Sequence, residues 1–181
     1  MSDWWPPILQ TALGGVIGAV GAVIGGAFGS WFTWQKERQS LAAALAGEVE
    51  AVKAVTEFRR YRQVLLWCID QTNATGKVVY LTFSIDEHPF PAYEQNVGKI
   101  GHLPPDLARD VALFYNYAKS LVQDIRTMST KNLYEWAANL ATQFMGEMVK
   151  VLDASTKLAE QLIPKLREES ARDWKKTLEP S

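Results

Sequence analysis

Residues that could support catalysis or metal binding are few in this chain, and they are scattered. The chain has two histidines, His88 and His102, and one cysteine, Cys68. Asp86, Glu87 and His88 form a close group, but they are too few to close a zinc site. Cys68 is flanked by apolar residues, which is typical of a thiol in a protein core. We therefore expect no enzyme, no metal site and no cofactor.

Phosphate and nucleic-acid chemistry is not indicated either. The glycines are concentrated between Ile8 and Trp34, and no Walker lysine follows them, so they do not form a phosphate-binding loop. The net charge of the 181 residues is -1, which gives no general attraction for nucleic acid. We expect no nucleic-acid partner.

Two other groups of side chains could bind a ligand. The basic run Arg59, Arg60 and Arg62 could contact an anionic ligand or a lipid head group, although a solvated helix face explains it equally well. Six aromatic residues could line a pocket or fill a core. They are Phe83, Phe90, Tyr93, Phe114, Tyr115 and Tyr117.

The stretch from Ile8 to Trp34 is the element around which the rest of the chain is organised. No charged residue lies between Asp3 and Lys36. A helix of about 20 apolar residues crosses a bilayer, so residues 8–34 are predicted to form one transmembrane helix. A cleaved secretory signal and a buried hairpin helix of a soluble protein are the alternatives. The absence of a basic segment before the stretch speaks against a signal.

Small residues gather on one face of this predicted helix. Glycine lowers the stability of a helix interior, and a helix face with this many glycines therefore calls for a structural reason. In lipid, small residues let two helix backbones approach closely, and we expect copies of the chain to associate there. The predicted interface consists of Gly14, Gly18, Gly21, Ala22, Gly25, Gly26 and Gly29, with Gly15 on the same face.

The flanks of the stretch predict its orientation. Basic residues follow the stretch and none precedes it, and positive charge favours the cytoplasmic side. We expect a single-pass protein of the inner (cytoplasmic) membrane with its C-terminal domain in the cytoplasm. Interfacial aromatic and basic residues are predicted to anchor it against lipid. These residues are Trp4, Trp5, Trp31, Trp34, Lys36 and Arg38.

The rest of the chain predicts an all-α domain. We divide the chain into an extracytoplasmic tail (1–7), the transmembrane helix (8–34), a cytoplasmic helical domain (35–176) and a tail (177–181). The transmembrane helix is predicted to continue as one rod to a stop near Asn73, with a bend at Gly47 as an option. Residues 78–85 have a strand-like composition, and a strand, an extended segment or more helix all remain open.

Two further long helices complete the predicted bundle. One begins at Pro104–Asp106 and runs to about Met128. The other follows a cap at Ser129, Thr130 or Asn132, and Pro164 is expected to kink or end it. Its predicted apolar face is Leu133, Trp136, Ala137, Leu140, Phe144, Met148, Val151, Leu158 and Leu162. Leu166 and Trp174 predict a short additional helix. Amphipathic helices that each carry one apolar face are expected to pack as an antiparallel bundle.

One segment carries a resemblance to other proteins. Tyr93-Glu94-x-Asn96-x-x-Lys99-x-Gly101-x-Leu103-Pro104-Pro105, followed by Phe114-Tyr115, resembles uncharacterised bacterial membrane-anchored helical proteins. The resemblance covers about a quarter of the chain. It implies a fold plan and a location, and it implies no activity.

Two functions follow as hypotheses. The first is a membrane-anchored, self-associating scaffold or interaction protein, whose partners are membrane lipid, further copies of the chain, and an unidentified cytoplasmic protein or small molecule. The second is a signal-gated membrane effector or pore-forming protein with a cytoplasmic sensing domain. The lack of a polar stripe between residues 8 and 34 weighs against a water-filled channel.

Overall fold

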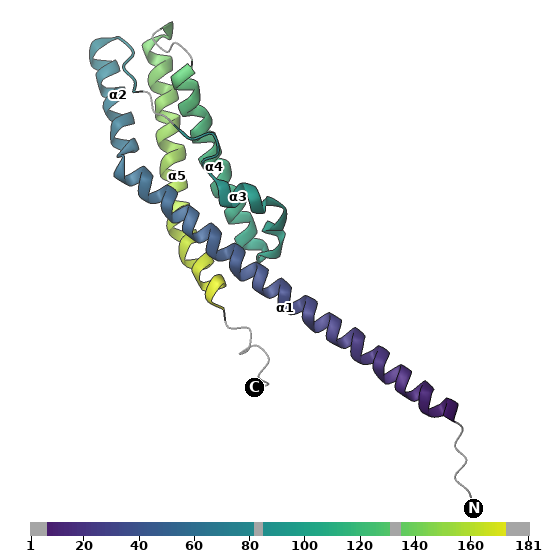
Figure 1. Ribbon diagram of the computed structural model, residues 1–181. Helices are drawn as coiled ribbons and strands as arrows, with labels where there is room; N and C mark the ends of the chain where they lie inside the picture. The colour runs from purple at the N-terminus through teal and green to yellow at the C-terminus, as the bar shows by residue number, and fades with distance from the viewer. Residues whose placement is uncertain (1–6, 82–84, 131–134, 173–181) are drawn as a thin grey trace, which may run out of the picture.

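The computed structural model describes residues 7–81, 85–130 and 135–172, and inside the first helix it describes side chains from Gly29 onward. The elements are α1 (Pro7–Phe58), α2 (Tyr61–Thr75), α3 (Pro91–Asn96), the 3-10 helix η1 (Val97–His102), α4 (Pro105–Thr130) and α5 (Ala138–Ala171) (Figure 1). The described residues contain no strand, which confirms the all-α prediction. Residues 78–81 and 85 are neither strand nor helix, and residues 82–84 lie outside the described part.

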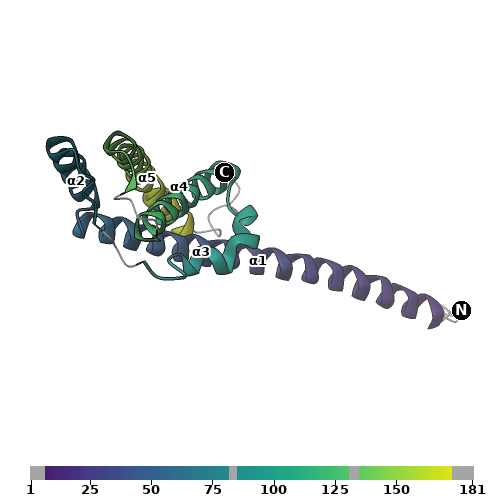
Figure 2. The same cartoon turned by 90° about the horizontal axis from the view of Figure 1, so that it is seen from above.

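Helix α1 is continuous over 52 residues, from Pro7 to Phe58, so the segment after Trp34 continues the same helix as predicted. Gly47 lies inside it without interrupting it. Its N-terminal half extends away from all other elements in both ribbon views (Figures 1 and 2). Burial against the domain begins at Leu41.

Within the described residues, no helix has an apolar stretch long enough to cross a membrane. Residues 8–28, which make up most of the predicted span, have no described side chains.

The predicted uninterrupted helix to Asn73 is wrong, because α1 ends at Phe58 and α2 begins at Tyr61. Arg60 adopts a left-handed conformation between them (φ 52°), which costs a non-glycine residue about 1–2 kcal/mol. No glycine or proline marks this corner in the sequence. The predicted stop is confirmed to within a few residues, because α2 ends at Thr75 and Gly76 (φ 66°) caps it by donating to the Thr72 carbonyl oxygen.

Helix α5 is the central element of the domain. It contacts α1, α2 and α4, and it runs antiparallel to each of them in Figure 1. Seen from above, α2, α5 and α4 lie in one row and α1 crosses below them (Figure 2). Apart from Val149, the buried positions of α5 alternate steps of four and three residues, which is the spacing of a coiled-coil seam. This α5 seam is Ala141, Met145, Met148, Leu152, Ser155, Ala159, Leu162, Leu166 and Glu169.

The predicted apolar face of α5 is therefore wrong at several positions. Leu140 is 54% exposed, whereas its neighbour Ala141 is buried. Large apolar residues make up most of the predicted face, whereas alanine, serine and glutamate occupy much of the observed seam.

The predicted ends of this helix also need correction. It continues through Pro164 to Ala171 instead of ending there, so Leu166 belongs to α5 and not to a separate helix. Ser129 and Thr130 lie in α4, and the residue before α5 is Ala137, which makes no side-chain cap. Asn132, Leu133 and Trp174 lie outside the described residues.

The buried side chains form two clusters along α5. The lower cluster joins α1, α3, α4 and the second half of α5, and Leu45, Phe114 and Leu162 are among its members. The upper cluster joins α2, α4 and the first half of α5 through residues such as Leu65 and Met148. The domain thus has two packing centres that share one helix.

We predict that Leu162→Ala lowers the free energy of unfolding by about 2–5 kcal/mol, because Leu162 is fully buried in the lower cluster. Leu140→Ala is the matched control, and its exposed side chain should change stability by about 0.5 kcal/mol or less. Urea unfolding of the full chain in a non-ionic detergent, followed by circular dichroism, measures both. Equal effects of the two substitutions would contradict the observed seam.

Candidate functional site: a cavity at the α1–α2 corner

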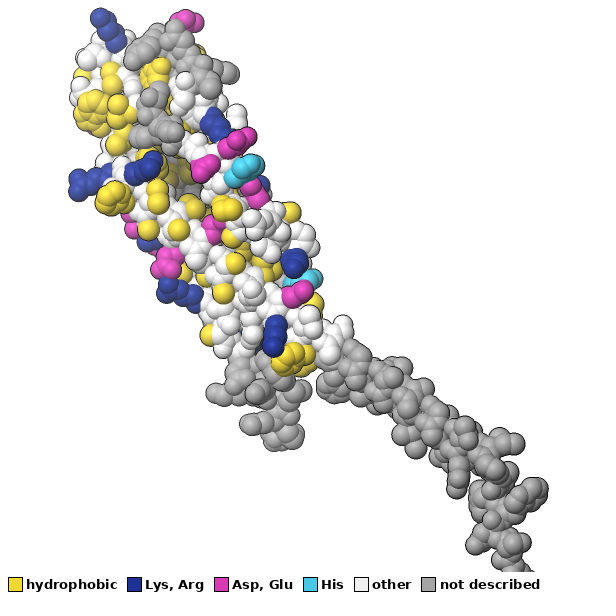
Figure 3. Space-filling model, in the orientation of Figure 1, with side chains coloured by type: hydrophobic (Ala, Val, Ile, Leu, Met, Phe, Trp, Pro, Cys, Tyr) yellow, Lys and Arg dark blue, Asp and Glu magenta, His cyan; other side chains and the backbone are white. Residues whose placement is uncertain are grey.

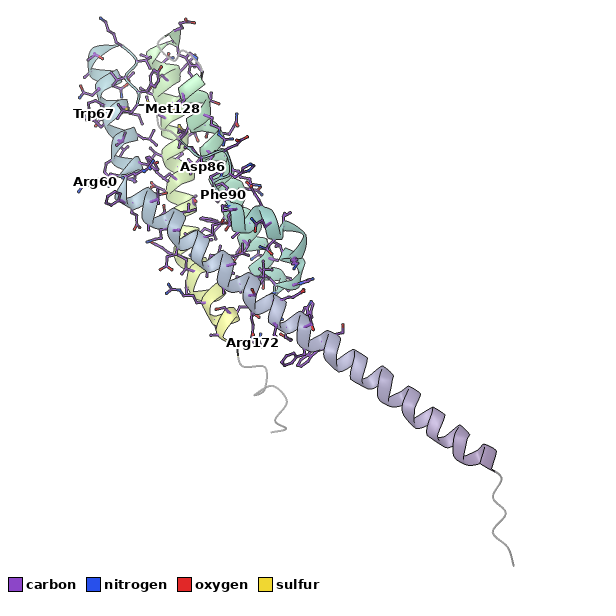
Figure 4. The ribbon with its side chains drawn as sticks, viewed as in Figure 1. Arg60, Trp67, Asp86, Phe90, Met128 and Arg172 are labelled. Carbon is purple, nitrogen blue, oxygen red and sulfur yellow. The ribbon has the colours of Figure 1, made fainter. Side chains whose placement is uncertain are left out.

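A cavity of about 680 Å³ lies where the two clusters meet. We call it the corner cavity, because the end of α1 and the start of α2 form one of its sides. It is bounded by α1, α2, α4 and α5, and by the segment from Ile85 to Ala92 that leads from α2 to α3. Asp86 and Phe90 of this segment are labelled in Figure 4, between α5 and α4.

The walls of the corner cavity are mostly apolar, with polar and charged side chains among them. Ala51, Val52 and Val55 face it from α1, and Leu65 faces it from α2. Its remaining apolar lining includes Phe90, Phe114, Ala118, Leu121, Val122, Ile125, Met148, Leu152 and Ala159. This composition, with few polar groups, is that of a small-molecule site.

Small side chains on the helices explain why space remains there. Ser155 and Ala159 occupy consecutive positions of the α5 seam, and Ala118 of α4 also lines the cavity. All three are buried. The corner at Arg59 and Arg60 turns α2 away from the axis of α1, so neither helix fills the gap that these small residues leave.

Four charged side chains line the corner cavity, namely Glu48, Lys53, Arg59 and Asp86. Lys53 Nζ lies 2.7 Å from Glu57 Oε1 and 3.8 Å from Glu160 Oε1. The Asp86 carboxylate accepts a long bond from the backbone N–H of His88 (3.4 Å). Arg59 Nη1 donates to the Tyr61 hydroxyl at 3.0 Å and has no carboxylate within ion-pair distance in the described part of the chain.

Glu48 connects α1 to α3 and α4. Its carboxylate accepts bonds from the backbone N–H groups of Ala92 (2.7 Å) and Tyr93 (3.0 Å) at the start of α3. The Tyr115 hydroxyl donates to the same carboxylate at 2.6 Å. Three donors therefore hold a carboxylate that lies between Leu45 and Val52 on the apolar stripe of α1.

Tyr115 is fully buried within the aromatic cluster. Its ring stacks on Tyr93 with centroids 3.9 Å apart and meets Phe90 and Phe114 edge to face. Burial raises the pKa of the Tyr115 phenol well above its usual range, and the bond to Glu48 raises it further. Core packing therefore accounts for Tyr93 and Tyr115, whereas Phe90 and Phe114 also face the corner cavity. Phe83 lies outside the described residues.

The structure separates the three predicted arginines. Arg62 Nε lies 2.8 Å from Asp153 Oδ1 of α5, Arg59 lines the corner cavity, and Arg60 is exposed on the outer side of the corner (Figure 4). They do not form one anion site. Only Arg59 contributes to the described cavity.

The predicted lipid anchors lie where α1 leaves the domain. Arg38 Nε lies 2.5 Å from Glu169 Oε1, and both side chains are nearly buried, so this arginine is engaged inside the protein. Its guanidinium also lies 5.5 Å from the Trp34 ring centroid. Lys36 is exposed above the Phe32 ring, and Trp31 is 36% exposed. Aromatic and basic groups are visible at this end of the described surface in Figure 3. Trp4 and Trp5 lie outside the described residues.

Other sequence-predicted residues contribute no reactive group. Cys68 is 1% exposed, and burial raises the pKa of its thiol, as expected of a core cysteine. His88 Nδ1 lies 3.2 Å from Glu94 Oε2, and the His102 ring is tilted by 53° against that of Trp34, with centroids 6.1 Å apart. Within the described ranges, no three His, Cys, Asp or Glu side chains come together in a way that could hold a metal ion.

The predicted glycine interface falls mostly outside the described side chains. Nothing can be placed for Gly14, Gly18, Gly21, Ala22, Gly25 and Gly26 beyond their position in the α1 backbone. Gly29 is exposed, and a Cβ atom added there would meet nothing within 4 Å.

Sequence reasoning missed Glu48, Glu169 and the corner cavity. Glu48 and Glu169 each lie on an apolar helix stripe, three residues after a buried leucine. An acid at such a position is a detectable signal, because a buried carboxylate needs partners. The cavity has no such signal, because it arises from a corner without glycine or proline.

No protein-family model, curated protein or solved structure matches this chain. The resemblance of residues 93–115 to membrane-anchored helical proteins stays a prediction.

Tyr115→Phe tests the buried phenol through its pH dependence. The folded state raises this pKa, so the stabilisation is complete below the usual value of about 10 and declines as the unfolded chain ionises above it. The parent chain should lose about 1.4 kcal/mol per pH unit more than Tyr115→Phe above pH ~10. Near pH ~8, loss of the bond to Glu48 should cost the variant about 1.5–3 kcal/mol. Urea unfolding at pH ~8 and at several pH values above ~10 measures both effects, and parallel pH curves would contradict the assignment.

Proposed function

We propose that this protein is a membrane-anchored, self-associating scaffold whose helical domain presents an interaction surface in the cytoplasm. The observation that supports this most directly is the form of α1. One unbroken helix runs from Pro7 to Phe58, yet burial against the domain begins at Leu41. In both ribbon views the N-terminal half of this helix extends away from the other elements (Figures 1 and 2), and an isolated helix is only marginally stable in water.

Lipid suits the composition of that half. Residues 8–34 extend over about 40 Å as a helix, and a bilayer core is about 30 Å thick. No charge interrupts them. The exposed Trp31 lies near the end of this stretch and Lys36 follows it, at the point where a cytoplasmic interface would lie. The basic residues after residue 34 favour a cytoplasmic domain.

The small-residue face of this helix supports self-association. Gly14 and Gly18, and then Gly21, Gly25 and Gly29, recur every fourth residue. Close backbone approach between copies would offset the helix propensity that each glycine loses.

The domain carries exposed apolar side chains that a protein partner could cover. Phe58 is 88% exposed at the end of α1, and Trp67 (Figure 4) is 50% exposed on α2. Leu66 beside it is 36% exposed. Aromatic side chains of this kind are typical contacts in protein interfaces.

A signal-gated membrane effector is the second candidate, and the corner cavity favours it. A ligand bound between α1 and α5 would lie against the same helix that is proposed to enter the membrane. Ion flux from liposomes that carry the purified protein separates this function from a scaffold.

We predict that replacing Gly21 and Gly25 together by leucine shifts the detergent-solubilised protein to a monomer, because the added side chains would hold the helix backbones apart. Light scattering with detergent correction measures the protein mass. The double variant Val20→Phe, Ile24→Phe adds comparable bulk on the opposite face and should leave the mass unchanged. An unchanged mass in the glycine variant would refute the proposed interface.

A further inference from the structure

We propose that the corner cavity binds a single-chain anionic amphiphile, namely a medium- or long-chain carboxylate whose chain occupies the apolar interior and whose head group pairs with Arg59. The proposal concerns the cavity alone. It would supply the signal for the second candidate function, and it does not depend on self-association.

The interior of the cavity specifies the chain. Its volume of about 680 Å³ falls in the usual range of ligand sites, which is roughly 300–1,000 Å³. Val122, Met148 and Leu152 are among the apolar residues that line it, and Ser155 of α5 supplies a buried hydroxyl. A ligand with several donors or acceptors along its length would leave them without partners, whereas an alkyl chain loses nothing there.

The charged residues of the lining specify the head group. Lys53 is paired with two carboxylates, and Glu48 has three donors. Asp86 is an anion that accepts a long backbone bond, so Arg59 is the lining cation without a carboxylate partner among the described residues. Arg59 contacts a neutral hydroxyl, and it is exposed to solvent at the end of α1. A carboxylate is the anion that a planar guanidinium pairs with in bidentate geometry. A cation without a carboxylate partner beside an apolar space therefore matches one carboxylate on one chain.

The test uses the full chain, purified in a sterol-based non-ionic detergent that carries no alkyl chain. The probe is dodecanoic acid with a photoreactive diazirine in mid-chain, and mass spectrometry locates the labelled residues. We expect labelling at Val122, Met148 or Leu152, and displacement by unlabelled dodecanoate. Across octanoate, decanoate and dodecanoate, the concentration for half displacement should fall about fourfold per methylene.

Two arginine variants test the head group. Arg59→Gln should weaken displacement by dodecanoate about tenfold, which is the loss of one charge-assisted contact. Arg60→Gln is the matched control, because Arg60 is the adjacent exposed arginine and does not line the cavity, and it should have no effect. Dodecanol should bind the parent chain about as weakly as dodecanoate binds Arg59→Gln.

Ser155→Leu tests the location of the chain. The added side chain would fill the cavity, so labelling inside it should be lost while circular dichroism and the melting temperature show a folded domain. If that variant does not fold, the labelled positions and the two arginine variants still decide the question.

Several results would overturn the proposal. They are labelling confined to residues outside the lining, equal behaviour of Arg59→Gln and Arg60→Gln, or equal displacement by dodecanol and dodecanoate. Displacement by a two-chain phosphatidylglycerol as effective as that by dodecanoate would also overturn it in favour of a membrane lipid. None of these results affects the mass of the glycine variants, so failure here is distinguishable from failure of the scaffold function.

Discussion

The α5 seam is the constraint on which the rest of this structure depends. Helix α5 contacts α1, α2 and α4, and its buried positions keep a coiled-coil spacing from Ala141 to Glu169. On one side of Ser155, Met148 and Leu152 of the seam line the corner cavity, and on the other side Leu162 and Leu166 belong to the lower cluster. Where the seam carries Ser155 and Ala159, the two clusters separate and the corner cavity remains. The position of the candidate site thus follows from the residue sizes along one helix.

Two carboxylates, the buried Glu169 and the half-buried Glu48, attach α1 to this framework. Glu169, near the C-terminal end of α5, lies against Arg38, and Arg172 Nη1, from the residue just after the helix, lies 3.6 Å from Glu169 Oε2. A carboxylate near a helix C-terminus opposes the helix dipole, so these two cations offset an unfavourable position. Further along α1, the Glu48 carboxylate accepts hydrogen bonds from the start of α3 and from the Tyr115 hydroxyl of α4. These contacts attach the segment of α1 from Arg38 to Glu48 to α3, α4 and α5.

This arrangement joins the two halves of the proposed function. Any displacement of α1 caused by a ligand in the corner cavity would be carried along an unbroken helix to residues 8–34. Conversely, association of those residues between copies would bring several domains side by side. The same helix serves anchoring, assembly and sensing in this proposal.

Much of the fold could be predicted from the sequence, because its signals are local. Pro105 and Asp106 mark the start of α4, and Gly76 marks the end of α2. The α1–α2 corner could not be predicted, because a left-handed arginine leaves no compositional trace. The face of α5 was misassigned, because burial there depends on which helices surround it and not on residue hydrophobicity. The candidate site was missed for the same reason, since a cavity is a property of three-dimensional packing.

The central claim is that α1 passes without a break from the membrane into the domain. Cysteine scanning along α1, in a chain whose buried Cys68 is replaced by serine, tests it most directly. Single cysteines from residue 2 to residue 44 are treated in intact cells and in opened membranes with a maleimide that cannot cross lipid. The account predicts protection across residues 8–34 in both cases, labelling at residue 2 in intact cells, and labelling at Lys36, Ser40 and Ala44 only after the membranes are opened. Rapid labelling across residues 14–28 would contradict it.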